Sequence, residues 1–91
     1  MKKVWIAQNI SRWVSVDLDE IESFHYEETD KSDTTYLYIN NKRIVKDFDV
    51  ELFCALEDYL GNRFSLKEEV TLEKLLKRIE ISNEERKYEE E

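Results

Sequence analysis

The residues with the most obvious chemistry are the carboxylates crowded into residues 16–33, VDLDEIESFHYEETDKSD. This stretch carries eight acids and one base, Lys31, whereas the other seventy-three residues hold fourteen acids and thirteen bases, so the net charge of −8 is almost wholly local. Carboxylates at this density can bind a hard cation, meet a basic partner, or form an ordinary solvated hairpin. The acids are Asp17, Asp19, Glu20, Glu22, Glu27, Glu28, Asp30 and Asp33.

Calcium is the metal best suited to such oxygen ligands, and segments beginning at Asp17 and Asp30 imitate the opening of an EF-hand loop. The sixth position of that loop requires glycine, but it is Glu22 in the first segment and Thr35 in the second. A structural zinc site usually needs four nitrogen or sulfur ligands, and the chain has one histidine and one cysteine. We therefore expect no metal and no other cofactor, with a calcium-binding protein as a less favoured alternative.

Nucleophilic catalysis lacks its usual parts in this sequence. His25 is the only histidine, and Cys54 falls on a predicted apolar helix face, where burial would keep the thiol protonated. The single glycine excludes a phosphate-cradling or dinucleotide-binding loop. Paired carboxylates remain, but a chain of 91 residues has little room for the apolar cleft that their acid–base chemistry needs. We expect a protein that is not an enzyme.

Size and composition predict one small soluble domain. The content is 41% apolar with eleven aromatic residues, which suffices for one core. The single cysteine excludes an intramolecular disulfide and fits a reducing cytoplasm. The N-terminal apolar run VWIA is too short for a signal peptide, and no segment reaches the roughly 18 apolar residues of a membrane span. Because an acidic chain repels nucleic acid and anionic lipid, we expect a cytoplasmic protein that binds neither directly.

The first half of the chain alternates as antiparallel strands do. The alternation of apolar residues breaks at 17–20, which predicts a turn or bulge there. The polar segment 29–33 is rich in turn formers and predicts a loop, and Asn40-Asn41 suits a tight hairpin, because Asn tolerates the left-handed conformation. The expected strands cover residues 4–8, 12–16, 21–28, 35–40 and 42–48.

A first helix is predicted over residues 50–60. Asp49 can cap its first amides, and Phe48 with Phe53 forms a hydrophobic staple. Gly61 stands where a helix commonly ends in a left-handed residue. The apolar face comprises Val50, Phe53, Cys54, Leu56 and Leu60.

A second helix is predicted over residues 66–81. Ser65 and Glu68 have the spacing of a capping box, although Thr71 is an alternative point at which the helix restarts. After this helix only Tyr88 could be buried, so residues 83–91 read as a charged tail that is a frayed helix or disordered. The expected buried residues are Leu66, Val70, Leu72, Leu75, Leu76 and Ile79.

These elements predict an α+β fold. An antiparallel sheet of about five strands, from residues 4–48, is followed by the two helices, which pack on one of its faces. Residues 1–82 form the single domain and residues 83–91 the tail. The other face of the sheet is left to solvent or to a partner.

On a strand over residues 21–28, alternate side chains share a face, so Glu22, Phe24, Tyr26 and Glu28 project together. In protein interfaces carboxylates steer association and aromatic rings supply contact area. The complement of such a surface is a basic one, such as a nucleic-acid-binding surface. We therefore predict a site for a basic partner protein at Asp17, Asp19, Glu20, Glu22, Phe24, Tyr26, Glu27, Glu28, Asp30 and Asp33.

With VDLDEIESFHYEETDKSD, its small size and its acidity, the chain resembles the anti-defence proteins of phages and mobile elements. Anti-CRISPR and anti-restriction proteins belong to this class, and several imitate DNA. The resemblance implies an inhibitor that covers the basic surface of a defence nuclease. It rests on size and charge, so no functional residues are carried over. Immunity proteins against nuclease toxins, and small transcription or stress-response regulators, share these properties.

A different role is also open. Trp5, Trp13, Tyr36 and Tyr38 would form an exposed sheet face if they are not covered by the helices, and such a face could join copies of the chain into a homo-oligomer. Packing in the core is the commoner use of such residues.

Overall fold

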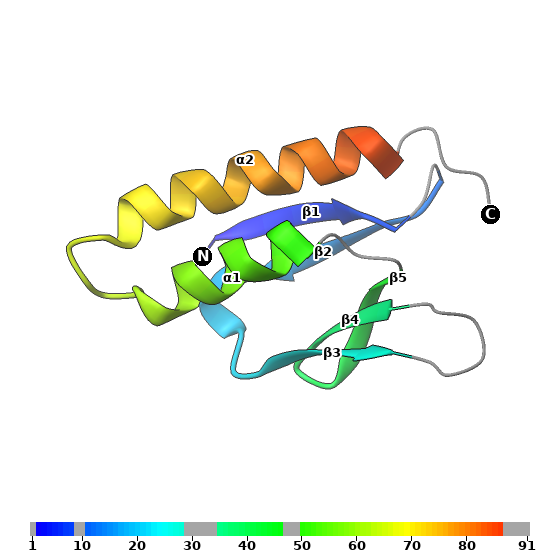
Figure 1. The fold of residues 1–91 in the computed structure, drawn as a ribbon, viewed down its shortest axis with the longest axis horizontal. Coiled ribbons are helices and arrows are strands. Elements are labelled where there is room, and N and C mark those ends of the chain that lie inside the picture. The colour runs from blue at the N-terminus through cyan, green and yellow to red at the C-terminus, as the bar shows by residue number, and fades with distance from the viewer. Residues whose placement is uncertain (1, 9–10, 29–34, 47–49, 87–91) are drawn as a thin grey trace.

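The computed structural model describes residues 2–8, 11–28, 35–46 and 50–86 (Figure 1). It confirms the α+β class and about five strands, all of them antiparallel, followed by two helices. The strands form two sheets and not one, with orders β1-β2 and β3-β4-β5. The elements are β1 (Lys3–Ala7), β2 (Trp13–Asp17), the 3-10 helix η1 (Leu18–Glu20), β3 (Phe24–Glu28), β4 (Thr35–Ile39), β5 (Lys42–Lys46), α1 (Val50–Gly61) and α2 (Glu68–Arg86).

The predicted break after β2 separates the two sheets. The Asp17 carboxylate accepts a hydrogen bond from the Asp19 amide at 3.0 Å and so caps η1. Leu18 and Ile21, on either side of the turn, are 1% and 3% exposed and anchor it in the core. The chain stays extended without strand pairing after η1, so β3 begins at Phe24 and not at the predicted residue 21.

The β4–β5 hairpin turns where the sequence predicted. Asn40 and Asn41 have φ of 52° and 65°, the left-handed conformation that a two-residue turn requires. Leu37 and Ile39 are buried on one face of β4, and the tyrosines between them lie on the other. The predicted loop 29–33 lies outside the described residues.

Both sheets and both helices contribute to one core. The β1–β2 sheet provides Val4, Ile6 and Val16, and α2 packs along β1 and against α1 (Figure 1). Tyr59 of α1 and Leu75 of α2 are fully buried at the centre. The other buried apolar residues of the core are Leu18, Ile21, Leu37, Ile39, Ile44, Val45, Leu52, Leu56 and Ile79.

The buried face of α1 differs from the predicted one. Leu52, Leu56 and Tyr59 are buried, whereas Val50 and Cys54 are exposed, so the expectation of a buried thiol was wrong. Both sets of residues have helical spacing, and burial of the large Tyr59 ring rotates the helix away from the predicted stripe.

The buried face of α2 also differs. Leu75 and Ile79 are buried as predicted, but Leu66, Val70 and Leu76 are exposed. Their places are taken by Thr71, Ser82 and Arg86. The Thr71 hydroxyl donates to the Lys67 and Glu68 carbonyls at 2.8 and 3.0 Å, which satisfies it within an unbroken helix, so the helix does not restart there.

The turn between the helices uses different residues from those predicted. α1 ends at Gly61, but the left-handed residue is Phe64, with φ of 66°. α2 begins at Glu68, where the Ser65 hydroxyl accepts from the Lys67 amide at 3.1 Å and the Glu68 carboxylate accepts from the Phe64 amide. In a standard capping box the donors would be the amides of Glu68 and Ser65. Here each donor is the preceding amide in the chain, so the reciprocal pattern is kept with a shift of one residue. The predicted cap and staple at Asp49 and Phe48 lie outside the described residues.

The C-terminal end of α2 continues to Arg86, beyond the predicted end of the helix at residue 81. Asn83 binds the outer edge of β1: its side-chain oxygen accepts from the Ala7 amide at 2.8 Å, and its nitrogen donates to the Trp5 carbonyl at 2.9 Å. The Asn83 side chain therefore forms hydrogen bonds with backbone groups of β1 that could otherwise pair with another strand. Residues 87–91 lie outside the described residues.

Replacement of Asn83 by Ala should lower the free energy of unfolding by about 1–3 kcal/mol, because the Ala7 amide, in a residue 1% exposed, loses its partner. Urea denaturation measures the change. Glu80→Ala, on an exposed position of the same helix, is the control and should change stability by less than about 0.5 kcal/mol. Equal effects of the two substitutions would show that Asn83 does not hold α2 to β1.

Candidate protein-binding surface

Three of the predicted carboxylates lie together on the segment that joins the two sheets. Asp19, Glu20 and Glu22 are exposed in and directly after η1, and we call these three residues the acidic ridge. Asp17 is half-buried, and its carboxylate accepts from the amides of Asp19 at 3.0 Å and Lys2 at 3.3 Å. Asp17 therefore acts as a structural cap for the ridge and is not part of its open surface.

Asn40 holds the ridge from the side of the β4–β5 turn. Its side-chain oxygen accepts from the amides of Glu22 at 2.8 Å and Ser23 at 3.0 Å, and its nitrogen donates to the Glu20 carbonyl at 3.0 Å. The Asn40 amide also donates to the Ser23 carbonyl at 2.8 Å. One side chain thus fixes the backbone that carries two of the three ridge carboxylates.

Replacement of Asn40 by Gly should preserve the turn, since Gly adopts φ of 52° readily, but remove all three side-chain hydrogen bonds to the ridge. We expect the free energy of unfolding, measured by urea denaturation, to fall by about 1–2 kcal/mol. Hydrogen exchange should become faster at the amides of Glu22 and Ser23. Asn41→Gly, at the next left-handed position, is the matched control. Unchanged exchange at Glu22 and Ser23 in Asn40→Gly would show that the Asn40 side chain does not hold the ridge backbone.

Arg63 holds the same segment from the side of the α1–α2 turn. Its guanidinium donates to the carbonyls of Leu18 at 3.0 Å and Ile21 at 3.2 Å. The two carbonyls flank the ridge carboxylates Asp19 and Glu20 along the chain. The ridge therefore sits between two turns that are distant in sequence, and its position is set by the tertiary fold.

An ion pair fixes the start of α2 to the N-terminus. The Lys2 ammonium lies 2.8 Å from one oxygen of the Glu68 carboxylate. The other oxygen of that carboxylate accepts a hydrogen bond from the Phe64 amide. The Lys2 ammonium, and after it the Phe64 amide, holds the pKa of Glu68 below its ordinary value of 4.5. The Glu68 carboxylate in turn raises the pKa of Lys2 above 10.5. Both groups are charged near neutral pH.

Because the pKa of Glu68 is lowered by folding, its contribution to stability is present above its unfolded value of about 4.5 and is lost as the pH falls through the folded value. Glu68→Gln should therefore be less stable than the wild type at pH 7 and equally stable at pH 2. Urea denaturation at pH 7, 4 and 2 measures this difference. The exposed neighbour Glu69 provides the control substitution Glu69→Gln. A Glu68→Gln difference that persists unchanged at pH 2 would contradict the electrostatic origin.

The two aromatic residues of the predicted site pack against α1. Phe24 and Tyr26 both turn toward Phe53 of α1, with ring centroids 5.1 and 5.4 Å apart respectively. Phe24 is half-buried there, while 51% of Tyr26 remains exposed. The alternation along the strand was predicted, but the face that carries these rings is the one that α1 covers. These two residues therefore contribute mainly to packing between β3 and α1.

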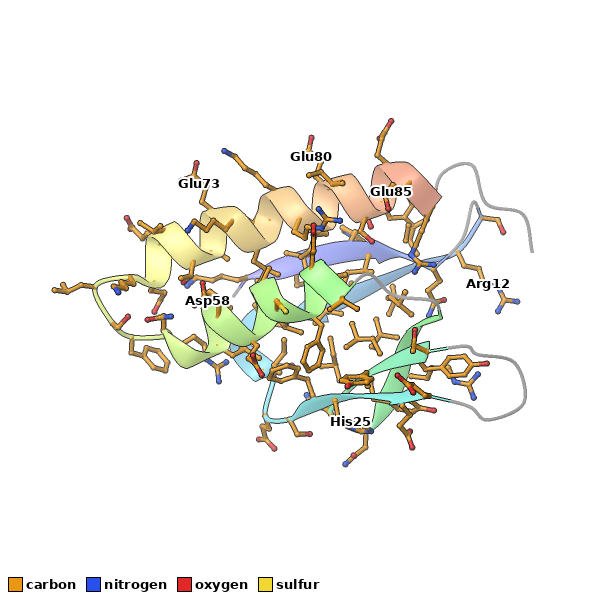
Figure 2. All side chains as sticks on the ribbon, viewed as in Figure 1. Arg12, His25, Asp58, Glu73, Glu80 and Glu85 are labelled. Carbon is orange, nitrogen blue, oxygen red and sulfur yellow. The ribbon has the colours of Figure 1, made fainter. Side chains whose placement is uncertain are left out.

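Glu27 and Glu28 are exposed on β3, apart from the ridge. Glu27 lies 3.6 Å from the His25 imidazole, which projects from the side of β3 away from α1 and stacks on Tyr38 at 5.0 Å between ring centroids (Figure 2). Asp30 and Asp33 lie outside the described residues. The structure therefore brings together only three of the predicted acids as one fixed surface.

Further aromatic residues lie on the faces of the two sheets that point away from the core. Trp5 and Trp13 are 59% and 51% exposed, on the face of the β1–β2 sheet that the helices do not cover. Tyr36 and Tyr38 are half-buried on the outer face of the second sheet, where the Arg43 guanidinium lies 4.5 Å from the Tyr36 ring centroid. The tryptophans thus provide a second candidate surface.

The exposed pair Phe64 and Leu66 in the α1–α2 turn was not predicted from the sequence. Leu66 was assigned to the buried face of the second helix. A signal was present, because NRFSLKE places a phenylalanine between a predicted helix stop and a predicted cap, where a turn lies at the surface.

No protein-family model, curated protein or solved structure matches the chain. Among the described residues, no three His, Cys, Asp or Glu side chains are grouped so that they could hold a metal ion. Neither described helix combines the length and the apolar character needed to span a membrane.

Proposed function

We propose that this chain is a non-enzymatic binding protein whose acidic ridge occludes a basic surface of a partner protein. The observation that carries the proposal is the fixed geometry of the ridge: Asp19, Glu20 and Glu22 are exposed, while Asn40 and Arg63 bind the backbone that carries them. Preorganised charges lose little conformational entropy when a partner binds.

The charge of the ridge favours a cationic partner. Within the described part of the chain, neither Glu20 nor Glu22 is engaged in an ion pair, so both carboxylates are available to lysine or arginine. Exposed carboxylates of one sign accelerate association with a basic surface and suppress binding to acidic ones.

The class of partner that fits best is a protein that binds nucleic acid, since its lysines and arginines are arranged to meet phosphates. A fixed row of carboxylates can occupy such a surface in place of the nucleic acid. We therefore favour a cytoplasmic inhibitor of a defence nuclease or of a similar nucleic-acid-binding protein.

A homo-oligomer is the second candidate function. The exposed Trp5 and Trp13 lie on the uncovered face of the β1–β2 sheet, and large exposed aromatic residues are enriched in protein interfaces. Sedimentation at increasing protein concentration distinguishes this possibility, because Trp5→Ala with Trp13→Ala would abolish self-association and leave the ridge intact.

Neutralising the ridge by Asp19→Asn, Glu20→Gln and Glu22→Gln should slow association with the basic partner about tenfold at low salt, with a smaller effect on dissociation. The experiment is capture from a nuclease-treated lysate of the native host, followed by association kinetics with the captured protein. Raised salt should reduce wild-type binding in the same way, because it screens the exposed charges.

The matched control neutralises Glu73, Glu80 and Glu85, which are exposed on α2, and changes the net charge by the same three units. Glu73 and Glu80 project from the side of α2 away from the sheets (Figure 2). The control should bind like the wild type. Equal loss in both variants would show that only net charge matters, and undiminished binding by the ridge variant would refute the proposed function.

A further inference from the structure

The α1–α2 turn exposes two large apolar side chains almost completely. Phe64 is 93% and Leu66 103% exposed, and Val70 in the first turn of α2 is 55% exposed. We call Phe64 and Leu66 the apolar tip. Single exposed apolar residues are common, but two of this size in one short turn, where polar residues would also fit, indicate contact with another molecule.

Phe64 also adopts an unfavourable backbone conformation. Its φ of 66° lies in the left-handed region, which bulky residues rarely occupy. Glycine or asparagine would adopt this conformation at a lower cost in free energy. The phenyl ring makes no compensating contact with the core, since it is 93% exposed. A phenylalanine at this position is therefore unfavourable for folding, which points to a role in binding.

The turn holds the tip in a fixed position. The Phe64 amide donates to the Glu68 carboxylate, and the Ser65 amide and hydroxyl donate to the Asn62 carbonyl at 3.1 and 2.7 Å. The Asn62 side chain donates to the Asp58 carbonyl at 2.8 Å and so continues these bonds into α1. The tip is thus presented on a rigid turn and requires little ordering when it binds.

The apolar tip and the acidic ridge are joined directly. Arg63, which precedes Phe64, donates to the Leu18 and Ile21 carbonyls of the ridge segment. The ridge segment lies below α1, and the turn that carries the tip extends from the C-terminal end of that helix (Figure 1). Exposed carboxylates and exposed apolar side chains therefore stand on two backbone segments that Arg63 links and that hydrogen bonds hold in place.

We propose that Phe64 and Leu66 insert into an apolar patch flanked by basic side chains on the partner protein. This inference rests on the proposed function and identifies the apolar anchor of the same site, in place of Phe24 and Tyr26. The ridge accelerates the encounter and the tip slows dissociation, a division of roles that is common in protein interfaces. The acids beside the tip disfavour an anionic membrane or a second copy of this acidic chain as the occupant.

The test uses two synthetic helical peptides of equal length and positive charge, one of lysine and leucine and one of lysine and glutamine. The wild type should bind the lysine–leucine peptide at least tenfold more tightly, as measured by titration calorimetry. Phe64→Gly and Leu66→Ala should each remove most of this preference while leaving the binding of the lysine–glutamine peptide unchanged. Val50→Ala, at an apolar position that is 69% exposed outside the tip, is the control and should keep the preference.

The melting temperature of Phe64 variants shows whether Phe64 serves binding or the stability of the fold. Phe64→Gly and Phe64→Asn should melt at or above the temperature of the wild type, because both relieve the left-handed phenylalanine. A clear fall in melting temperature in both variants, or a full preference for the lysine–leucine peptide in Phe64→Gly, would overturn the proposal.

The variant with a neutralised ridge tests the proposed function separately from the role of the tip. The ridge variant should bind both peptides more weakly, and if it binds both normally, the proposed function fails irrespective of the tip. Vesicles of phosphatidylserine and phosphatidylcholine, and sedimentation of the protein alone, test other occupants. Vesicle binding or self-association that Phe64→Gly abolishes would overturn the assignment of a basic protein partner.

Discussion

The fold depends on how the chain crosses from one sheet to the other. The two sheets share no strand pairing among the described residues, and residues 18–23 are the described segment that connects them. Leu18 and Ile21 anchor this crossing in the core, while Asn40 and Arg63 satisfy its exposed backbone groups. The same crossing therefore carries three exposed carboxylates on a backbone that these hydrogen bonds hold in place.

The exposed carboxylates and the exposed apolar residues of the proposed site come from different parts of the chain. The ridge comes from the β2–β3 connection and the tip from the α1–α2 turn, and Arg63 joins the two. Phe24 and Tyr26, which are close to the acids in sequence, instead pack against Phe53. This division is physically reasonable, since an aromatic residue on a strand beneath a helix stabilises the core, whereas one in a turn can reach a partner.

The sequence predicted those features that depend on local backbone chemistry. Asn40-Asn41 required a left-handed turn, and the broken alternation at 17–20 marked the crossing. The division into two sheets depends on tertiary pairing, which local patterns do not encode. The buried face of α2 was missed because apolar residues lie on several sides of that helix, and the small Thr71 and Ser82 permit close packing there. The ridge carboxylates could be predicted, but the tip could not, because Leu66 also fits a helical apolar stripe.

A map of the contact surface on the protein itself would decide whether the ridge and the tip bind the partner. Amide chemical shifts of the isotope-labelled chain would be followed during titration with the captured partner or with the lysine–leucine peptide. The shift changes should concentrate at residues 18–23 and 62–67, the two segments joined by Arg63. Changes concentrated instead around Trp5 and Trp13, with both of these segments unaffected, would contradict this expectation and would move the interface to the outer face of the β1–β2 sheet.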